Sequence, residues 1–526
     1  MPGTSFLSTT IPYVNAHPHL GHALEYVQSD AFVRHMRRAG GDTFFLSGSD
    51  ENSLKNVLAA QRLGVTTREL VDQNVHKFTD LLRALDVDLS YFIRTSTDRD
   101  HIDGATAIWR RMQRAGDIYS KEYEGLYCVG CEQFYAEPEL VDGLCPEHLT
   151  RPEPVSEQNY FFRLSRYQDR ILELIEKGDL SIVPAARSNE VVSFVRSGLA
   201  DISISRSRAR ARDWGIPVPD DPEQVMYVWI DALTNYVNAL GWTRDDERYR
   251  RYWVDARRRI HVVGKGVIRF HAVYWPAMLL SAGLPVPTDI VVHGYITLSG
   301  RKISKSLGNV IDPAELVERF GADAVRYFLL ADFSPFGDGD FSEDRLVARY
   351  NGDLANGLGN LVNRVASMTG RYRGGVVPAA GPVGEPERSL VAQLTTSSHA
   401  AREAMDRFDH REATARVFDL VRRTNAYVDE RSPWHLAKAA GDDADSAALL
   451  DTTLHHLAGT VQGLAAMMSP FLPAATARIA RAWHIGADEL SRQGDSRQGD
   501  SRQGDGPPDL TGRRIEKPPT LFPRIG

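Results

Sequence analysis

The amino-acid sequence predicts an α/β protein in which a parallel sheet, interrupted by an inserted module, is followed by an α-helical bundle. Strand-like and helix-like segments alternate near the N-terminus, as in parallel sheets covered by helices. A cysteine-containing stretch then breaks this alternation, and the last third of the chain has apolar residues spaced by three and four. With 526 residues, the chain has room for roughly three or four domains.

Composition narrows the class of protein. Apolar residues make up 42% of the chain and charged residues 25%, which argues against wholesale disorder. A net charge of −7 means that nucleic-acid binding would need local basic patches. There is no apolar run of about 18 residues and no secretory signal. Only three cysteines are present, so we expect a reducing, cytoplasmic location without membrane association.

The first half of the parallel sheet is expected within residues 1–118. Residues 5–15 and 40–50 are predicted strands, and helices are predicted over 52–64 and from about His22 to residue 40. Ligands of such sheets bind beyond the carboxyl ends of the strands. The segment Tyr13–His22 and Asp50 lie at those ends, so we expect the functional site there.

Changes of pattern give the remaining boundaries. We expect the inserted module at 119–222, the second half of the sheet at 223–300, a loop and connecting region at 301–348, and the helical domain at 349–486. Residues 491–505 repeat Ser-Arg-Gln-Gly-Asp three times and cannot bury apolar area, so 487–526 is expected to be a linker and tail. The last seven residues are apolar enough to dock on the body.

Two short motifs are suited to phosphate chemistry. His19-Leu20-Gly21-His22 places two imidazoles at a predicted helix N-terminus, where backbone N–H groups favour anions. Lys302-Ile303-Ser304-Lys305-Ser306 alternates ammonium groups with hydroxyls on a loop, as a clamp on polyphosphate would. Taken singly, they also fit a capped turn with surface histidines and a solvated loop; their order within an interrupted α/β domain favours the phosphate interpretation.

The cysteines form a third motif with Cys128-x2-Cys131-x13-Cys145-x2-His148 spacing. Three thiolates and one imidazole complete a tetrahedral zinc site and leave no open position. We therefore expect one structural zinc ion per chain, holding an insert too small to be stable alone. Incidental reduced cysteines are the alternative.

Other groups of residues are ambiguous from the sequence. Aromatic residues at predicted strand ends or on the following helices fit a ligand pocket, but equally an aromatic core. Asn360 and Arg364 share a helix face and Trp434 follows a Ser-Pro step, which also fits ordinary surface and packing residues. The arginines at 206, 208, 210, 212 and 257–259 fit either phosphate contacts or a solvated face.

These motifs and further stretches resemble methionyl-tRNA synthetases, which are class I aminoacyl-tRNA synthetases with HIGH and KMSKS signatures. The resemblance spans residues 10–438. It is carried by TIPYVNAHPHLGHALE, FFLSGSDE, FIRT, SISR, VMYVWIDALTNY, FHAVYWPA, VVHGYI, KISKSLGNVIDP, DAVRYFLL, NGLGNLVNR and DERSPWHLAK. Synthetases for branched aliphatic amino acids carry large editing insertions, and this chain has no room for one.

The resemblance implies a Rossmann-like doubly wound sheet, with 301–348 as the KMSKS loop and stem-contact region. It implies activation of L-methionine by ATP with Mg²⁺ and transfer to tRNA(Met), by a monomer. Catalytic roles fall to His19, His22, Lys302 and Lys305. The implied ATP site is His19, Gly21, His22, Glu25, Gly294, Lys302, Ser304 and Lys305. The implied methionine site is Ile11, Tyr13, Asp50, Trp229, Ala232, Leu233, Tyr236, Val267, His271 and Trp275. Asn360, Arg364 and Trp434 would read the CAU anticodon.

The sequence departs from the family at two places near the expected site. Asn52-Ser53 replaces the usual His-Gly after Asp50-Glu51, and Gly266 replaces an acidic residue after Gly264-Lys265. These changes leave open a catalytically weak or specialised second-copy homologue that acts as a tRNA-binding or regulatory protein. A nucleotidyltransferase of small molecules is a further alternative, disfavoured by the helical domain and the lysine loop.

Overall fold

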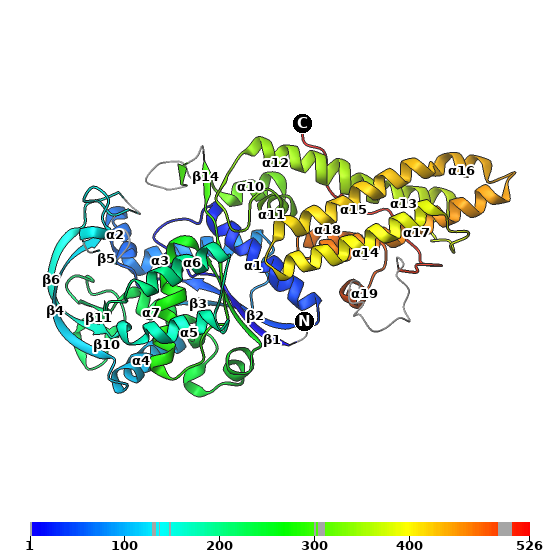
Figure 1. Cartoon of the computed structure of the whole chain (residues 1–526). Coiled ribbons are helices and arrows are strands. Elements are labelled where there is room, and N and C mark those ends of the chain that lie inside the picture. The colour runs from blue at the N-terminus through cyan, green and yellow to red at the C-terminus, as the bar shows by residue number, and fades with distance from the viewer. Residues whose placement is uncertain are drawn as a thin grey trace.

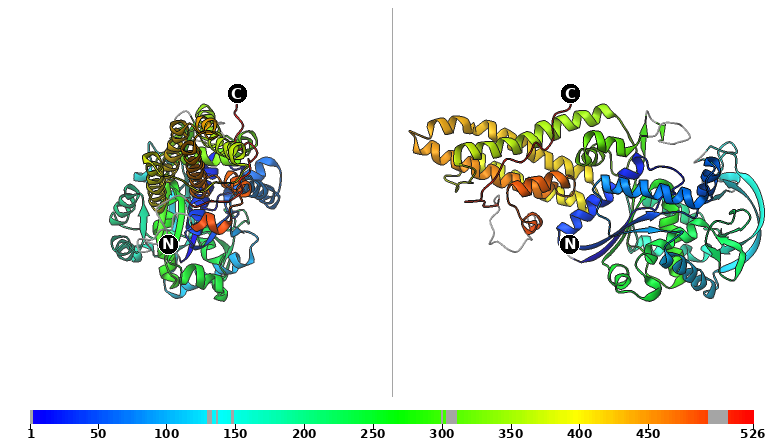
Figure 2. Two further views of the ribbon diagram at one scale, coloured as in Figure 1. Left: turned by 90° about the vertical axis from the view of Figure 1, so that its right-hand side faces the viewer. Right: turned by 180° about the vertical axis from the view of Figure 1, so that it is seen from behind.

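The computed structural model describes residues 3–128, 133–135, 137–146, 149–298, 301–302, 311–492 and 508–526. It is elongated, with a sheet-containing half and a helical half (Figure 1). Seen from behind, the antiparallel strands of the insert lie at one end and the helical bundle ends at the other (Figure 2). No helix among these residues is both long and apolar enough to cross a bilayer.

A six-stranded parallel sheet forms the centre of the first half. Its order is β3 (Tyr91–Arg94), β2 (Asp42–Ser49), β1 (Thr4–Ser8), β12 (Arg258–Gly264), β13 (Asp289–His293) and β7 (Ser181–Val183). The chain runs outward from β1 on one side and returns through β12 on the other. The strand order therefore reverses between β1 and β12, where doubly wound sheets bind ligands.

Helices surround this sheet (Figure 1). They are α1 (Leu20–Arg38), α2 (Leu54–Leu63), α3 (Thr67–Ala84), α4 (Arg99–Arg114), α7 (Val228–Asn238), α8 (Glu247–Tyr249) and α9 (Trp275–Ala282). Seven of the eight residues of β2 are buried, as expected for a strand covered on both faces. The first helix begins at Leu20, two residues before the predicted start, because His19 caps its N-terminus.

The inserted region is mostly antiparallel. One sheet contains β5 (Gln133–Tyr135), β4 (Ile118–Cys128), β6 (Glu153–Phe162) and β8 (Ile202–Ser203), and another contains β10 (Pro217–Val218), β11 (Asp221–Met226) and β9 (Ser205–Ser207). Between β6 and β8 in the chain, helices α5 (Gln168–Glu176) and α6 (Ala185–Arg196) flank β7. Because β7 pairs with β13, the range 119–222 also supplies the edge strand of the main sheet. Three residues are too short to show this in the sequence.

The second half is helical. A small sheet of β15 (Arg301–Lys302), β14 (Ile296–Leu298) and β16 (Gly339–Asp340) lies at its start, with β16 following the first two helices in the chain. The helices are α10 (Pro313–Phe320), α11 (Ala322–Ala331), α12 (Glu343–Arg349), α13 (Asn360–Arg373), α14 (Glu385–Asp406), α15 (His410–Arg431), α16 (Pro433–Ala439), α17 (Ala444–Met468), α18 (Pro473–Ala482) and α19 (Ala487–Arg492). A π-helical stretch, Tyr350–Gly359, leads into α13.

Helix α1 joins the two halves. Its Asp30 forms a fully buried ion pair with Arg326, whose guanidinium also donates to the carbonyl of Pro470. Phe32 of α1 stacks on Phe408 of the α14–α15 turn, with ring centroids 4.1 Å apart. The helix that begins at the paired histidines is therefore fixed at its other end by the bundle.

The C-terminal segment packs on the bundle, which confirms that the apolar tail docks. Leu521 and Phe522 are buried in the main core cluster. Asn351 exchanges two hydrogen bonds of 3.0 Å with the backbone of Ile525. Most of the repeat between α19 and this segment lies outside the described residues.

Candidate active site

The two histidines of the first motif are held in one geometry. The His22 Nδ1 accepts from the backbone N–H of His19 at 3.0 Å, and the His19 Nδ1 accepts from Gly21 N–H at 3.1 Å. The rings stack with centroids 3.9 Å apart. Since both Nδ1 atoms accept, each neutral ring carries its proton on Nε2. A Cβ on Gly21 would lie 2.9 Å from the His19 ring, which explains the glycine.

A buried acid–base pair lies one turn further along α1. The Glu25 carboxylate accepts from the N–H and hydroxyl of Thr10, beyond the end of β1, and lies 2.7 Å from the His293 Nε2 at the end of β13. Burial lowers the pKa of His293, but the hydrogen bond and charge of Glu25 outweigh burial and raise it. This contact ties α1 to the strand ends on both sides of the sheet reversal.

The lysine motif begins just beyond this pair. Gly294 follows His293, and a Cβ there would meet the backbone of Gly337 at 2.1 Å, so no larger residue fits. The chain continues into β14, whose Thr297 pairs with the backbone of Lys302 in β15. Ser304 and Lys305 lie outside the described residues. The base of the lysine arm is therefore anchored beside the histidine helix.

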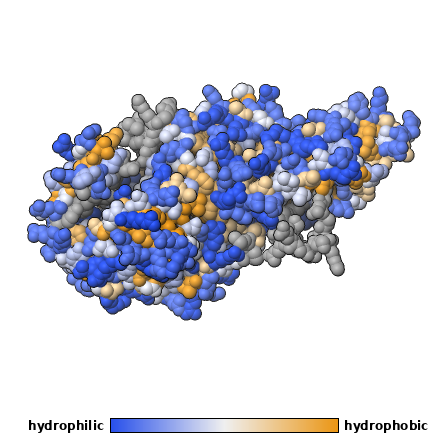
Figure 3. All heavy atoms as spheres, in the orientation of Figure 1, coloured by the Kyte–Doolittle hydropathy of each residue, from blue (hydrophilic) through white to orange (hydrophobic). Residues whose placement is uncertain are grey.

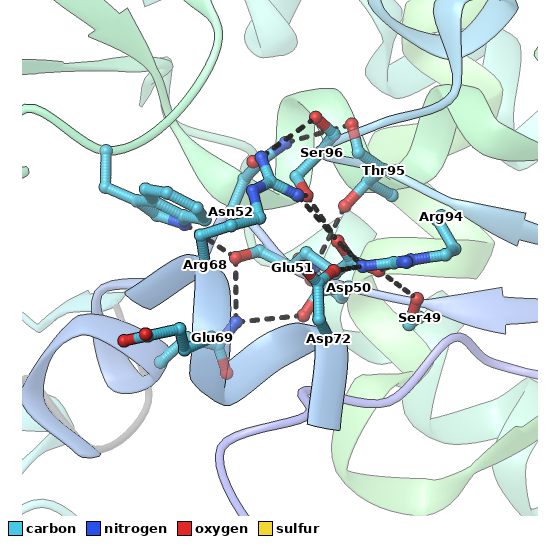
Figure 4. Close-up of polar contacts among 12 residues, drawn as sticks. Ser49, Asp50, Glu51, Asn52, Arg68, Glu69, Asp72, Arg94, Thr95 and Ser96 are labelled. Atoms are coloured by element: carbon cyan, nitrogen blue, oxygen red, sulfur yellow. Dashed lines mark hydrogen bonds and ion pairs between the residues drawn. The ribbon is translucent and has the colours of Figure 1, made fainter. Parts of the chain in front are cut away.

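The loop after β2 carries the predicted ammonium-binding residue, Asp50. Asp50 is 2% exposed, and its N–H donates to the carbonyl of Pro12 at 2.9 Å. The neighbouring Glu51 carboxylate is fully buried and accepts from Arg94 at 2.7 and 3.2 Å. Ser49 and Ser96 also donate to it, which closes the network drawn in Figure 4. Buried carboxylates need such partners, so Glu51 acts as a fixed support beside Asp50.

The two unusual residues that follow are accommodated by the structure. The Asn52 amide donates to Asp231 at 3.2 Å and more weakly to the carbonyl of Thr95. The Ser53 hydroxyl caps α2 by accepting from the N–H of Lys55. Both residues therefore stabilise the loop that carries Asp50, Asn52 by binding α7 and Ser53 by starting α2.

The glycine at position 266 also has a steric reason. A Cβ there would lie 2.3 Å from the Tyr295 hydroxyl. The preceding Lys265 pairs with Asp338 at 2.7 Å and lies over the Tyr295 ring. Tyr295 thus occupies the space into which a side chain at 266 would project.

The predicted methionine residues are brought together on one core cluster. Ring pairs connect Tyr13 with Trp229 at 6.3 Å and Trp229 with His271 at 6.2 Å. Leu233, Tyr236 and Trp275 are buried members of the cluster, and Ile11, Tyr13, Trp229 and Val267 pack against it partly exposed. Ala232 is 3% exposed on the same helix. Trp229 further stacks on Phe270, with centroids 3.9 Å apart.

The histidines of this pocket are held neutral. Burial lowers the pKa of His271 to about 4. Its Nδ1–H donates to the carbonyl of Val267 and its Nε2 accepts from Tyr236. Burial likewise lowers the pKa of His261, whose Nε2 accepts from the Trp275 indole at 3.2 Å. Apolar rings and uncharged imidazoles suit an uncharged, polarisable thioether.

On the surface of the sheet-containing half, orange hydrophobic atoms are visible among hydrophilic ones on the near face (Figure 3).

The predicted anticodon residues lie on α13 and α16, in the helical half. Arg364 lies 5.8 Å from the Trp434 ring centre and pairs with Asp429 at 2.8 Å. Trp434 is 41% exposed, unusual for so large an apolar side chain. Asn360 is exposed one turn before Arg364 on α13. An amide, a guanidinium and an indole are therefore presented to solvent on this half.

The comparisons with known proteins agree with this geometry. The model "tRNA synthetases class I (M)" matches residues 5–153 and 148–366, and "Anticodon binding domain of methionyl tRNA ligase" matches 377–523. The chain belongs to the methionyl-tRNA synthetase family. A Methionine--tRNA ligase of Rhizobium meliloti is 40% identical over 99% of this chain and 98% of its own. One of Brucella suis biovar 1 is 43% identical over 92% of each.

Solved structures of this family share the whole fold. The Mycobacterium tuberculosis methionyl-tRNA synthetase in complex with methionyl-adenylate is 39% identical, covers 99% of this chain and 100% of its own, and gives a TM-score of 0.91. The apo form of that enzyme is 37% identical and gives 0.85, with 100% and 99% coverage. The α/β fold with a parallel sheet and a C-terminal helical region is thus confirmed.

Two of the four expected zinc ligands are described. Cys128 and Cys145 are buried in one small cluster with Tyr135. Cys131 and His148 lie outside the described residues, and elsewhere in the described chain no group of three metal-ligating side chains occurs. Two thiols buried together in a small antiparallel insert fit a structural metal site.

Three of the arginines that the sequence left open between phosphate contacts and a solvated face have structural roles. Arg206 is 6% exposed, donates to Ser203 and lies over the Tyr227 ring. Arg258 pairs with Asp289, and Arg259 donates to backbone carbonyls. Neither a solvated face nor a phosphate surface describes these three.

Sequence reasoning missed the residues that support the site from behind. Glu51, His101, Trp214, Asp231 and His293 are of this kind, each acting through contacts far apart in the sequence. The buried His101 lies 3.4 Å from Asp231, so it reaches the Asn52 loop indirectly. Asp231 and His293 gave one signal, a polar residue inside an otherwise apolar stretch, but this signal does not reveal the partner.

Proposed function

We propose that this chain activates L-methionine with ATP and transfers the methionyl group to the 3′ end of tRNA(Met). The observation that carries this proposal is the juxtaposition at one sheet edge. Paired imidazoles at the start of α1, the Asp50 loop and an aromatic pocket all meet beyond the carboxyl ends of the strands. Membership of the methionyl-tRNA synthetases gives the reaction class, methionine--tRNA ligation.

In the first step, a methionine carboxylate oxygen bonds to the α-phosphorus of ATP, and the bond to pyrophosphate breaks. This step needs no protein nucleophile, so catalysis consists of positioning and charge stabilisation. The Nε2–H groups of His19 and His22 donate to the phosphate oxygens. Lys302, Ser304 and Lys305 hold the departing pyrophosphate. Mg²⁺ bound with ATP supplies further neutralisation of the phosphate charge.

Glu25 and Gly294 shape the nucleotide side of the site. Glu25 fixes α1 against β1 and β13 through Thr10 and His293. Gly294 allows the loop at Gly337 to lie against the strand end. Both act by keeping the backbone close around the nucleotide.

Methionine binds with its ammonium group on Asp50 and its thioether among the aromatic rings. A charge-assisted hydrogen bond to the carboxylate orients the amino acid. Sulfur–aromatic contacts favour methionine over aliphatic residues of similar size. Trp229 and Tyr13 form the partly exposed side of the pocket, while Tyr236, His271 and Trp275 form its buried wall.

The helical half binds the anticodon stem-loop. Trp434 stacks on an unpaired base, and Asn360 and Arg364 donate to base edges of CAU. Cys128, Cys131, Cys145 and His148 would hold one structural zinc ion, which would cross-link the insert and leave no position open for substrate.

Methionine-dependent exchange of pyrophosphate into ATP, followed by charging of tRNA(Met), tests the proposal. We expect exchange to require methionine and Mg²⁺, and charging to require the CAU anticodon. Charging without exchange is chemically inconsistent and would indicate contamination. A protein that binds tRNA(Met) but never exchanges pyrophosphate would be the silent homologue, and one without tRNA affinity would be a small-molecule nucleotidyltransferase.

A further inference from the structure

A turn of the inserted region reaches the loop that carries Asp50. Within this turn, Arg212 and Asp213 have successive left-handed conformations, with φ of 54° and 59°. Residues with a Cβ rarely adopt them, and such conformations gather at functional sites, where surrounding contacts hold them. The turn ends at Trp214, whose indole N–H donates to the carbonyl of Glu51 at 2.7 Å.

The backbone on either side of the Asp50 carboxylate is held by hydrogen bonds from several parts of the chain, among them one of 2.9 Å from the N–H of Glu51 to the Thr95 hydroxyl. The N–H of Asp50 donates to Pro12, and the Asn56 amide donates to the carbonyls of Asp50 at 3.1 Å and Glu51 at 2.8 Å. The carbonyl of Glu51 also accepts from the indole N–H of Trp214. This hydrogen bond comes from the inserted region, since Trp214 lies 163 positions after Glu51 in the chain.

The Trp214 ring is itself fixed. The Arg68 guanidinium lies 5.2 Å from the ring centre and donates to the Ser96 hydroxyl at 2.8 Å. Ser96 in turn donates to the Glu51 carboxylate. Both ends of Glu51 are therefore joined to the same Arg68–Trp214 pair, the carbonyl through Trp214 and the carboxylate through Ser96 and a 3.8 Å ion pair with Arg68.

We propose that Trp214 is a positioning residue that places the Asp50 carboxylate for the substrate ammonium, so that the inserted region sets methionine affinity. This inference rests on the proposed function. Without the indole N–H, the carbonyl of Glu51 keeps the Asn56 amide as a donor but loses Trp214, so the neighbouring Asp50 carboxylate is held less precisely. Because the aromatic pocket is built from other elements, recognition of the thioether is unaffected.

Trp214→Phe removes the donor and keeps a ring for Arg68. Two ligands separate the proposed role from general loosening. Methioninol keeps the ammonium and lacks the carboxylate, whereas 4-(methylthio)butanoate lacks the amine. We expect the Kd of methioninol, measured by calorimetry, to rise about two- to tenfold, the scale of one hydrogen bond. The Kd of 4-(methylthio)butanoate should stay within about twofold, because that ligand does not use Asp50.

In pyrophosphate exchange, the KM for methionine should rise by a similar factor, with kcat and the KM for ATP little changed. Tyr160→Phe is the matched control, since it removes a 3.0 Å hydrogen bond to Asp221 within the insert without touching Glu51. It should leave the Kd of both ligands unchanged. If Trp214→Phe unfolds, the benzothienyl analogue of tryptophan at this position, with sulfur in place of N–H, makes the same comparison.

An equal loss of affinity for both ligands would show that Trp214 supports the pocket as a whole. Unchanged affinity for both would show that the hydrogen bond from Trp214 does not contribute to binding. Either result overturns the inference while leaving the proposed function intact. Failure of the proposed function has a different signature, because the unmodified protein would then show no methionine-dependent exchange.

Discussion

Replacement of Trp434 by alanine separates amino-acid activation from tRNA recognition. Trp434 is 41% exposed on α16, and its ring lies near Arg364 and the neighbouring His435. Removing it costs little folding stability because the ring is not part of a core cluster. Its proposed ligand, an unpaired anticodon base, loses its stacking surface.

The size of the effect follows from the stacking energy. One base stacked on an aromatic side chain contributes about 1–3 kcal/mol. This corresponds to roughly a five- to 150-fold weaker interaction with tRNA. The loss should fall on kcat/KM for tRNA(Met) in charging. Pyrophosphate exchange, which uses only the strand-end site, should keep its rate and its KM for methionine.

The assay compares exchange and charging in the same preparation. Val383→Ala is the matched control, because Val383 is 47% exposed in the helical half and contributes no aromatic ring. It should alter neither reaction. Reduced exchange in Trp434→Ala, or unchanged charging, would refute the assignment of Trp434 to the anticodon.

Four further predictions concern the strand-end site and the insert. His22→Ala should strongly lower exchange while the Kd of methionine, measured by calorimetry, stays nearly constant; equal loss of both would mark a structural residue. Lys305→Ala should slow adenylate formation about ten- to a thousandfold in rapid quench, and a normal rate would remove the lysine from the site. Glu25→Gln should destabilise the protein by about 1–2 kcal/mol below pH 6.5, where His293 is charged in both folded and unfolded states. The raised pKa of His293 contributes stability that is lost as the pH rises through that pKa. In urea unfolding at pH 9, the free energies of unfolding of the variant and the unmodified protein should therefore differ less. A difference that does not change with pH would argue against the ion pair. Cys145→Ser should lower the zinc content from one ion per chain, measured by atomic absorption, and speed proteolysis of the insert; full zinc retention would exclude this ligand.

The sequence was sufficient for the elements that repeat a simple pattern. The β1–α1–β2–α2 alternation and the long apolar periodicity of α14, α15 and α17 predicted the sheet and the bundle, because period and length distinguish strands from helices. The strand β7 escaped prediction because Ser181–Val183 is too short to show any period. Its place in the main sheet depends on pairing with β13, more than a hundred residues away.

The site divides in the same way. Residues in compact motifs, such as His19 and His22, were visible because their spacing fixes their geometry on one helix turn. Glu51 and Trp214 were not, because the indole and the carbonyl meet only after the insert has folded back. The role of Arg206 stayed open for a similar reason, since a local run of arginines gives no sign that this one is buried over Tyr227.

The most direct test of the account is the structure of the protein bound to a non-hydrolysable methionyl-adenylate analogue, methionyl-sulfamoyl-adenosine. We expect its ammonium on Asp50, its thioether between Tyr13 and Trp229, and its sulfamate facing the Nε2 atoms of His19 and His22. An analogue bound away from the carboxyl ends of β1 and β12, or an ammonium directed away from Asp50, would contradict the central claim that these strand ends form the activating site.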